Sequence, residues 1–288
     1  YEKDEMVGGL LRFGIPDFKL EKKVIDRRVK ILEKEGILFQ TNKCLGKDIT
    51  IDRLDSKYDA VILCIGSTIP KDINIVGREL DGIHFAMDFL TMQNRINSNL
   101  NTDIKINAKN KNVIVLGGGD TGSDCIGTSN RHGAKTITQI ELLPRPPKER
   151  DKSMMWPLFA NTFKTSSSHE EGCDRVWGIK AKEFIGKDKI EYVRTEDISW
   201  DKQNKNFYIV ENSEKLIACD LLLIAIGYES PNLFFDDQFS IDLMSDGRIK
   251  ADDKNYLTSK ENFFTCGDSR RGQSLVVWAI KEGRDCAE

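Results

Sequence analysis

Three glycines with the spacing G-x-G-x-x-G are the residues of this sequence that point most directly to a chemistry. They are Gly117, Gly119 and Gly122. In this pattern the first glycine permits a tight turn, the second lets the backbone approach a pyrophosphate, and the third lets a following helix pack closely on the preceding strand. An acid further on stands at the spacing where a carboxylate binds the hydroxyls of an adenine ribose. The spacing therefore predicts a dinucleotide-binding site formed by Gly117, Gly118, Gly119, Asp120, Thr121, Gly122 and Glu141.

The sequence also indicates the elements that must position these residues. Residues 113–116 are all apolar, as is typical of a parallel strand buried on both faces. A helix over 121–132 would point its first N–H groups at the phosphates and end at Gly133, although Gly127 in its middle costs about 1 kcal/mol relative to alanine. A second strand, over 136–143, carries the acid. This context favours a nucleotide unit over an ordinary glycine-rich turn, which is the other interpretation of such a motif.

The composition of the chain argues against several other classes of function. With 288 residues the chain is long enough for two domains with cores of their own. A net charge of -3 argues against nucleic acid and anionic membranes as partners, and no apolar run reaches the roughly 18 residues of a membrane span. The seven cysteines form no C-x-x-C, which predicts reduced, buried thiols of a cytosolic type rather than a redox disulfide or an iron–sulfur site. The chain opens on Tyr1 without an initiator methionine, and we expect a fragment.

The chain contains an internal repeat at the level of architecture. Residues 58–66 and 219–227 both contain an aspartate that is followed by apolar residues and then by Ile-Gly, and each run follows short alternating strands. We therefore expect two similar α/β units, of which the first continues beyond the second with a strand and a Gly-Asp pair at 263–268. The other expected elements are helices at 20–35, 83–96 and 273–282, strands at 37–40, 50–51, 181–185, 190–193 and 207–210, a polar linker at 97–111 and an extended insertion at 144–178.

Two other motifs imitate catalytic or metal sites. His169 lies in the run SSSHEEG, but no second histidine stands at ligand spacing, so we expect it to organise a loop rather than to bind zinc or to catalyse. Tyr256 and Lys260 have the Tyr-x-x-x-Lys spacing of short-chain dehydrogenases. They lie in a polar stretch that is typical of a loop, and we interpret the spacing as chance.

Six stretches together resemble one family, the pyridine-nucleotide-dependent small subunit of glutamate synthase and, in particular, the C-terminal region of its fused, NADH-dependent eukaryotic form. The stretches are residues 8–28, 58–68, 77–90, 113–135, 166–186 and 263–287. The resemblance implies an α/β fold with two dinucleotide-binding (Rossmann-like) domains of the flavin disulfide-reductase type, the NAD(P)H domain being inserted in an incomplete FAD domain. In this arrangement residues 1–80 form the first part of the FAD domain, whose N-terminal strand and glycine loop are missing. A connecting helix and linker follow at 81–112. The NAD(P)H domain covers 113–230, and the second part of the FAD domain covers 231–288.

The resemblance also implies which residues contact the cofactors. Glu2 is similar to the acid that binds the FAD ribose, although its position alone fits an exposed acid equally well. Gly227, which ends the second run, is included among the cofactor-binding residues. The other residues that match positions near FAD are Gly8, Gly9, Leu10, Arg12, Gly66, Gly267, Asp268, Gln273, Ser274, Leu275 and Val276. Because the upstream glycine loop is absent, we expect weak or no FAD binding by the isolated fragment.

The function that the resemblance implies is the electron-input half of glutamate biosynthesis and ammonia assimilation. NADH or NADPH gives a hydride to FAD, and electrons pass through iron–sulfur clusters to an FMN site, both outside this chain, where 2-oxoglutarate and glutamine-derived ammonia become glutamate. Hydride transfer needs aligned rings more than an acid or a base, so we name no catalytic residue and no metal ligand. The implied partner is the large subunit or N-terminal region that holds the glutaminase and FMN domains. We expect a cytoplasmic protein, with an organelle as the alternative.

Two choices stay open. The residues ELL at 141–143 stand where NADPH-preferring members carry Tyr-Arg-Arg, and a carboxylate there repels a 2′-phosphate, so we expect NADH. Arg145, Lys148 and Arg150 nearby keep NADPH as the alternative. The same module also fits another acceptor, as in dihydropyrimidine dehydrogenase or a ferredoxin-linked NADP transhydrogenase, or a non-catalytic nucleotide-binding docking protein. The SSSHEEG run favours glutamate synthase, and the absence of C-x-x-C disfavours a thioredoxin-reductase-like activity.

Overall fold

The chain forms two compact units in the computed structural model, which describes residues 1–100, 103–150, 162–201, 206–231 and 240–288. The first unit consists of Tyr1–Gly9, Ile25–Lys71 and Gly227–Glu288, and the second of Leu10–Val24 and Asp72–Ile226. The segments of the two units alternate along the chain, so each unit is assembled from residues that are far apart in sequence. In the part of the chain that the structure describes, no helix combines the length and the apolar character that crossing a membrane requires.

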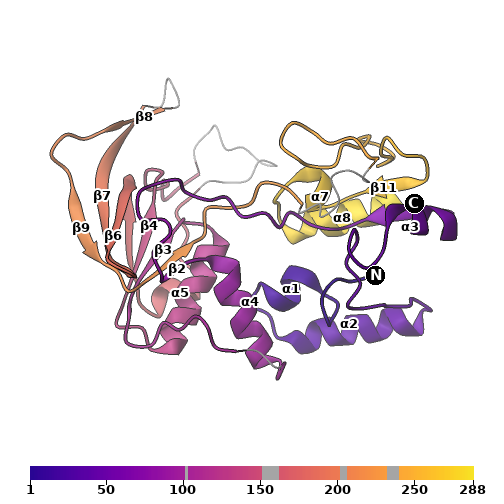
Figure 1. Ribbon diagram of the computed structural model, residues 1–288, viewed down its shortest axis with the longest axis horizontal. Coiled ribbons are helices and arrows are strands. Elements are labelled where there is room, and N and C mark those ends of the chain that lie inside the picture. Colours follow the sequence, from indigo (N-terminus) through magenta and orange to yellow (C-terminus); the bar gives the residue numbers. More distant parts are fainter. Residues whose placement is uncertain (101–102, 151–161, 202–205, 232–239) are drawn as a thin grey trace. The chain divides into compact units, whose positions relative to one another are not determined.

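The second unit is built on a five-stranded parallel sheet (Figure 1). In the order in which they lie, its strands are β2 (Ile83–Phe85), β10 (Leu221–Ile224), β3 (Asn112–Leu116), β4 (Thr136–Glu141) and β5 (Asp174–Trp177). The central strands β3 and β10 are buried almost throughout, as expected of a parallel sheet covered on both faces. From β3 the chain continues to β4 on one side, whereas β10 lies on the other side. The sheet therefore has a topological switch point at the end of β3, where ligands of such sheets bind.

Different layers cover the two faces of this sheet (Figure 1). On one face α4 (Ala86–Asn97) and α5 (Asp120–His132) pack through a core that includes Phe89 and Ile126. On the other face lies an antiparallel sheet that buries Phe184 in the core between the sheets. Its strands are β6 (Ile179–Gly186), β7 (Ile190–Asp201), β8 (Asn206–Ile209) and β9 (Lys215–Ala218), with β7 paired to the other three.

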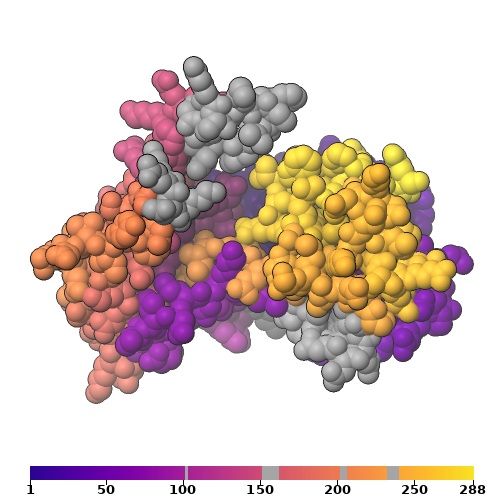
Figure 2. Space-filling model, turned by 90° about the horizontal axis from the view of Figure 1, so that it is seen from above, coloured from indigo at the N-terminus to yellow at the C-terminus, as the bar shows by residue number. Residues whose placement is uncertain are grey.

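The first unit contains a two-stranded parallel sheet of β1 (Val61–Leu63) and β11 (Phe263–Thr265). This pairing joins segments far apart in sequence, and Figure 2 shows yellow C-terminal residues beside purple residues of the earlier segment. The core of the unit contains Leu54, Ile249 and Phe263. Its helices are α3 (Ile51–Lys57), α7 (Asp268–Arg271) and α8 (Val276–Ala287), while α1 (Gly9–Phe13) and α2 (Lys22–Lys34) each contain a boundary between the units.

The predicted strand–helix–strand unit around the glycine loop is confirmed. β3, α5 and β4 follow one another as the sequence predicts, although the second strand stops at Glu141 rather than at residue 143. Gly133 ends α5 in the left-handed conformation, with a φ of 76° and its N–H bonded to carbonyls of the last turn. The local pattern therefore encodes this part of the fold.

Two of the short strands predicted in the first unit are wrong. Thr50 and Ile51 do not form a strand, because Thr50 caps α3 and its hydroxyl accepts a hydrogen bond from the N–H of Arg53 at 3.2 Å. Helix capping thus overrides the β propensity of this residue pair. Residues 37–40 lie outside any strand, although one backbone hydrogen bond, from the N–H of Glu2 to the carbonyl oxygen of Gln40, joins this stretch to the start of the chain.

Two segments that the sequence predicts to be irregular contribute to the second unit. Within the predicted linker at 97–111, Ile106 and Ala108 are buried in the core beside α4. The predicted insertion at 144–178 supplies the short helix α6 (Ser167–Glu170) and the edge strand β5. Residues 151–161 of this insertion lie outside the described residues.

The boundaries of the two compact units differ from the boundaries predicted for the domains. Residues 72–112 belong to the second unit, because β2 pairs with β10 and α4 packs on the parallel sheet. Residues 83–85 thus form a strand rather than the first turn of the predicted helix. Residues 10–24 also belong to the second unit, and residues 227–230 to the first. The assignment of one cofactor to each unit stays a prediction.

Candidate nucleotide-binding site

The glycine loop joins the end of β3 to the start of α5, at the carboxyl edge of the parallel sheet. Gly117 has a φ of 115°, and a Cβ there would lie 2.2 Å from the carbonyl oxygen of Ala225, just after β10. A Cβ at Gly122 would lie 2.5 Å from the Gly117 carbonyl oxygen, whereas a Cβ at Gly119 would have no atom within 4 Å. The loop therefore turns tightly at its first glycine, is open at its second and packs closely at its third, which is the geometry that the spacing predicts.

Among the described residues, nothing covers the start of α5 at the glycine loop, which is exposed. Gly119 is the N-cap of this helix and makes no side-chain capping hydrogen bond. The first N–H groups of a helix have no partner inside the helix, and the helix dipole favours negative charge at this end. Gly118, Gly119 and Asp120 are exposed, while Thr121 is half-buried. A phosphate group can therefore reach the N–H groups of this turn.

Glu141 lies beside this loop, at the end of β4. Its Oε2 accepts a hydrogen bond from the N–H of Gly118 at 2.5 Å, and its Oε1 accepts one from the N–H of Leu143 at 3.0 Å. Two backbone donors thus orient the carboxylate without neutralising its charge. A carboxylate in this place can accept hydrogen bonds from ribose hydroxyls and repels a phosphate on the 2′ position. That these residues contact a nucleotide stays a prediction.

Two arginines and two aromatic rings form a cluster beyond Glu141. The guanidinium of Arg145 lies 4.4 Å from the ring centroid of Phe163 and 5.1 Å from that of Trp177. The guanidinium of Arg175 lies 4.8 Å and 5.0 Å from the same two centroids. Trp177 is the register partner of Glu141 on the neighbouring strand. Arg145, one of the cations that keep NADPH open as the alternative, is therefore engaged with aromatic rings.

His169 lies in the short helix α6 rather than in a loop, and its ring makes local polar contacts. Its Nδ1 accepts a hydrogen bond from the N–H of Ser166 at 3.0 Å, within the capping box at the start of α6. Its Nε2 lies 3.1 Å from Oε1 of Gln139. Among the described residues, no group of histidine, cysteine and acidic side chains has an arrangement that could hold a metal ion. Tyr256 lies outside helices and strands, as expected, and its hydroxyl donates to Asp285 at 3.2 Å.

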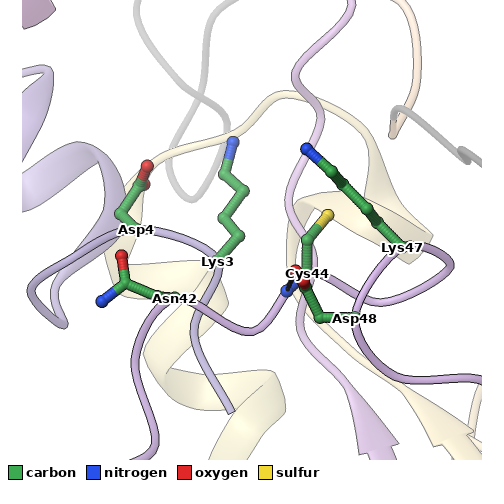
Figure 3. Close-up of a pocket in the computed structure, with 6 residues that line it drawn as sticks. All are labelled: Lys3, Asp4, Asn42, Cys44, Lys47 and Asp48. Carbon is green, nitrogen blue, oxygen red and sulfur yellow. Dashed lines mark hydrogen bonds between the residues drawn. The ribbon is translucent and has the colours of Figure 1, made fainter.

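In the first unit, Glu2 directly precedes two residues that line a polar pocket (Figure 3). Backbone hydrogen bonds join Glu2 to Gln40 and Lys43, and its side chain accepts from the N–H of Asp4 at 2.9 Å. Figure 3 shows the ammonium groups of two lysines extending to the same side of the pocket. Two aspartates share the lining with these lysines, so ammonium groups that could bind phosphate oxygens lie in a pocket whose charges are balanced. The pocket has a volume of about 380 Å³ and is lined by Lys3, Asp4, Asn42, Cys44, Lys47 and Asp48.

The Gly-Asp turn after β11 brings together several of the predicted FAD residues. Oδ1 of Asp268 accepts a hydrogen bond from the hydroxyl of Ser274 at 2.8 Å, and burial raises the pKa of Asp268. Oε1 of Gln273 accepts from the N–H of Tyr228 at 3.1 Å, and a Cβ at Gly227 would lie 3.0 Å from the same oxygen. Gly227 therefore lies in the first unit beside Gln273, rather than in the unit of the glycine loop.

The other predicted FAD residues are distributed over both units. Gly66 follows β1 with a φ of 73°. Gly8 and Gly9 close the first segment of the first unit, with φ values of 129° and 47°. Leu10 and Arg12 lie in α1 and belong to the second unit, with Leu10 exposed and Arg12 buried. Only glycine adopts such positive φ values without strain, which explains the residue type at the three glycine positions.

α8 begins at Val276 rather than at residue 273, where the sequence predicts its start. Leu275 is its N-cap, in an extended conformation, and makes no side-chain capping hydrogen bond. Both residues are exposed. The first N–H groups of α8 therefore have no side-chain partner at their N-cap, as is required of a helix start that faces a ligand.

Sequence analysis missed Glu282, which braces the Gly-Asp turn. Glu282 is 1% exposed, and its Oε2 accepts from the N–H of Gly267 at 2.8 Å. Its Oε1 accepts from Nη2 of Arg270 and from Nε of Arg271, each at 2.7 Å. Burial alone would raise the pKa of Glu282, but the hydrogen bonds from Arg270 and Gly267 outweigh it and hold the pKa below its usual value. An acid within a helix gives no signal of this role in the sequence.

Comparison with known proteins decides the family. A sequence model described as pyridine nucleotide-disulphide oxidoreductase matches residues 17–283. The chain belongs to this family. Over its whole length it is 43% identical to the glutamate synthase (NADH) of Saccharomyces cerevisiae and 39% identical to the glutamate synthase (NADPH) small chain of Bacillus subtilis. It spans 14% of the yeast protein and 61% of the bacterial one, and the resemblance to glutamate synthase is confirmed.

A solved structure agrees on the fold of this family member. Mycobacterium tuberculosis FprA in complex with NADPH superposes with a TM-score of 0.74 and covers 99% of this chain and 74% of that chain. The two sequences are 15% identical, so the similarity concerns the fold alone. Together with the family match, it confirms the predicted α/β fold of the flavin disulfide-reductase type.

Proposed function

We propose that this chain is the electron-input module of a glutamate synthase, in which the second unit binds NADH and the first unit holds FAD. When bound, FAD accepts the hydride of NADH. Electrons then leave this chain for iron–sulfur clusters and an FMN site elsewhere in the enzyme, where glutamate is formed. The observation that carries the proposal is the glycine loop with Glu141 hydrogen-bonded to it, in a chain that is similar to glutamate synthases over its whole length.

The second unit fits a nicotinamide dinucleotide. The open space at Gly119 and the uncapped start of α5 receive the pyrophosphate. The carboxylate of Glu141, fixed by two backbone N–H groups, accepts the ribose hydroxyls. These residues bind and orient the dinucleotide, and orientation is the main requirement of hydride transfer. No residue of the chain needs to act as a proton carrier.

The first unit fits the adenosine and phosphate parts of FAD. Glu2 offers a carboxylate for a ribose, and the adjoining pocket offers the ammonium groups of Lys3 and Lys47 for phosphate oxygens. At the other end of the unit, Glu282 holds the N–H of Gly267 and thereby fixes the turn that presents Asp268. The donors and acceptors present therefore suit the group that the family implies.

We propose NADH as the preferred dinucleotide. The charged oxygens of Glu141 stand beside the glycine loop and repel a 2′-phosphate, whereas the guanidinium of Arg145 lies over two aromatic rings. The relative that is 43% identical carries NADH in its name, and the one that is 39% identical carries NADPH. The choice between NADH and NADPH therefore depends on the side chain of Glu141.

Replacing Glu141 by alanine is expected to shift the dinucleotide preference toward NADPH. The variant loses the acceptor for the ribose hydroxyls, which weakens NADH binding by about tenfold, while NADPH no longer meets a like charge. Fluorescence titration of the full chain with each dinucleotide measures both affinities. Glu211→Ala, which removes an exposed glutamate of the same unit, serves as the control and keeps the original preference. An unchanged ratio of the two affinities in Glu141→Ala contradicts the role of this carboxylate.

The identity of the electron acceptor is tested with the complete enzyme that contains this chain. The proposed partner is the large subunit or N-terminal region with the glutaminase and FMN domains. NADH oxidation that depends on both 2-oxoglutarate and glutamine, and yields glutamate, is the expected result. Oxidation supported instead by a pyrimidine base or a ferredoxin shows that the module serves another acceptor. NADH binding without oxidation in the flavin-loaded enzyme points to a docking protein.

A further inference from the structure

A buried glutamine connects the glycine loop to residues much later in the chain. Gln139, in the middle of β4, is 2% exposed. Its Nε2 donates to the carbonyl oxygen of Gly117 at 2.9 Å. Its Oε1 accepts from Nε2 of His169 at 3.1 Å and from Nε of Arg175 at 3.2 Å. The amide is therefore held at both ends and presents a fixed donor to the first glycine of the loop.

The hydrogen bonds of His169 fix the position of its proton. Its Nδ1 accepts from the N–H of Ser166 at 3.0 Å, so Nδ1 carries no proton, and Nε2 carries the one that it donates to Gln139. Burial, together with the positive charges of Arg175 and Lys19, lowers the pKa of His169 to about 4. The ring is therefore neutral at neutral pH, and the direction of donation toward Gln139 is set.

A second arm of the same cluster reaches the other end of the loop. The hydroxyl of Ser166 lies 2.6 Å from that of Ser123 in α5, and the N–H of Ser123 donates to the carbonyl oxygen of Gly119 at 3.1 Å. The Gly117 carbonyl is thus held by a side chain of this cluster, whereas the Gly119 carbonyl is held by the backbone N–H of a residue whose hydroxyl belongs to it. We call this cluster the loop clamp, and its residues are Ser123, Gln139, Ser166 and His169.

The helix α6, which carries His169, is itself fixed on α5. A Cβ at Gly127 would lie 2.6 Å from the ring of Phe18 and 2.7 Å from Oγ of the fully buried Ser168. Arg131 of α5 makes two hydrogen bonds to the carboxylate of Glu171, at 2.6 Å and 3.0 Å. The glycine in the middle of α5 therefore permits a close approach that gives the loop clamp a rigid support.

The pair of Ser166 and His169 does not have the arrangement of a nucleophile with its base. The free face of such a serine must point to a substrate, whereas the hydroxyl of Ser166 contacts Ser123. The second ring nitrogen of such a histidine contacts a carboxylate, whereas here it contacts the amide of Gln139. The contacts of the pair therefore lead to the glycine loop and not to a substrate.

We propose that His169 is a positioning residue for dinucleotide binding, which acts through Gln139 on the peptide unit between Gly117 and Gly118. This inference rests on the proposed function, because it takes the loop to bind the pyrophosphate of NADH. The carbonyl of that planar unit is held by Gln139, and its N–H is held by Glu141. The peptide is thus oriented from both sides before the dinucleotide arrives, which removes an ordering cost from binding.

The test is a fluorescence titration of the full chain with NADH, combined with flavin reduction in the complete enzyme. His169→Ala is expected to weaken NADH affinity by about tenfold and to raise KM, with kcat little changed. His169→Gln places an N–H donor where Nε2 stood, and most of the affinity is expected to return. Gln139→Glu still accepts from His169 but no longer donates to Gly117 and places an oxygen against its carbonyl oxygen, so its loss should equal or exceed that of His169→Ala.

His132→Ala is the matched control. His132 is also half-buried, burial lowers its pKa, and its Nε2 lies 2.8 Å from Oε1 of Gln93, but it stands at the far end of α5. Its replacement should leave NADH affinity as it is. Equal losses from His132→Ala and His169→Ala, or no recovery in His169→Gln, would overturn the positioning role. If His169→Ala fails to fold, the NADH affinities of His169→Gln and Gln139→Glu decide whether His169 has the positioning role. Absence of NADH binding by the unsubstituted chain contradicts the proposed function itself.

Discussion

Replacing Gly117 by alanine is expected to lower NADH affinity by at least about 100-fold and the free energy of unfolding of the second unit by about 3 kcal/mol. The residue has a φ of 115°, which strains any residue with a side chain. Its Cβ would also lie 2.2 Å from the carbonyl oxygen of Ala225, so the backbone of the loop must move. Titration with NADH and denaturant unfolding of the full chain measure the two effects.

Two further glycine variants separate strain from ligand contact. Gly133 also has a positive φ, of 76°, but a Cβ there has no atom within 4 Å. Gly133→Ala should therefore cost about 1 kcal/mol of stability and leave NADH affinity unchanged. Gly119→Ala should fold normally and still weaken binding, because its methyl group would occupy the space that the pyrophosphate needs. Normal NADH affinity in both Gly117→Ala and Gly119→Ala would place the nucleotide elsewhere.

Replacing Glu282 by alanine is expected to destabilise the first unit by about 3 kcal/mol, because it removes the buried carboxylate that accepts from the N–H of Gly267 and from the half-buried Arg270. Glu282 is 1% exposed and accepts hydrogen bonds from Arg270, Arg271 and the N–H of Gly267. Hydrogen exchange of the amides in α8 and β11, together with denaturant unfolding, measures the loss unit by unit. Faster exchange should be confined to the first unit.

The charge of Glu282 also gives this stabilisation a pH dependence. Its pKa in the folded chain lies below the usual value of 4.5, so the stabilisation is fully present above that pH and is lost as the pH falls through the folded-state pKa. Glu282→Gln should be destabilised less than the alanine variant, and its stability should change less in acid. Glu261→Ala removes an exposed glutamate of the same unit as a control. Equal stabilities of Glu261→Ala and Glu282→Ala contradict the bracing role.

The glycine loop and its supporting elements could be predicted because they are encoded locally. The motif places its three glycines close together, at Gly117, Gly119 and Gly122. The apolar strand directly before them and the helix directly after them are their neighbours in sequence. Glu141 follows on the adjacent parallel strand, so the lengths of α5 and β4 bring it back to the loop. Spacing alone is sufficient for geometry of this kind.

The polar contacts that hold the site could not be predicted, because they join residues far apart in the chain. Gln139 stands in a strand of mixed polar and apolar residues, TITQIE, and nothing in its neighbours indicates the contact with His169. Gly127 is expected from the sequence to weaken α5, whereas the structure shows Phe18 and Ser168 packed where a side chain would stand. Patterns of hydrophobicity determine which faces are buried, but not which polar groups meet there.

Hydride delivery by this chain is measured by rapid mixing of the complete, flavin-loaded enzyme that contains it with NADH and, separately, with NADPH. Loss of the oxidised-flavin absorbance follows the hydride transfer that the chain is proposed to carry out. Fast bleaching by NADH and slower bleaching by NADPH are expected, because the carboxylate of Glu141 favours NADH. Faster bleaching by NADPH would keep the function and contradict the role of Glu141. No bleaching by either dinucleotide, with flavin present, would contradict the proposal that this chain delivers electrons from NADH.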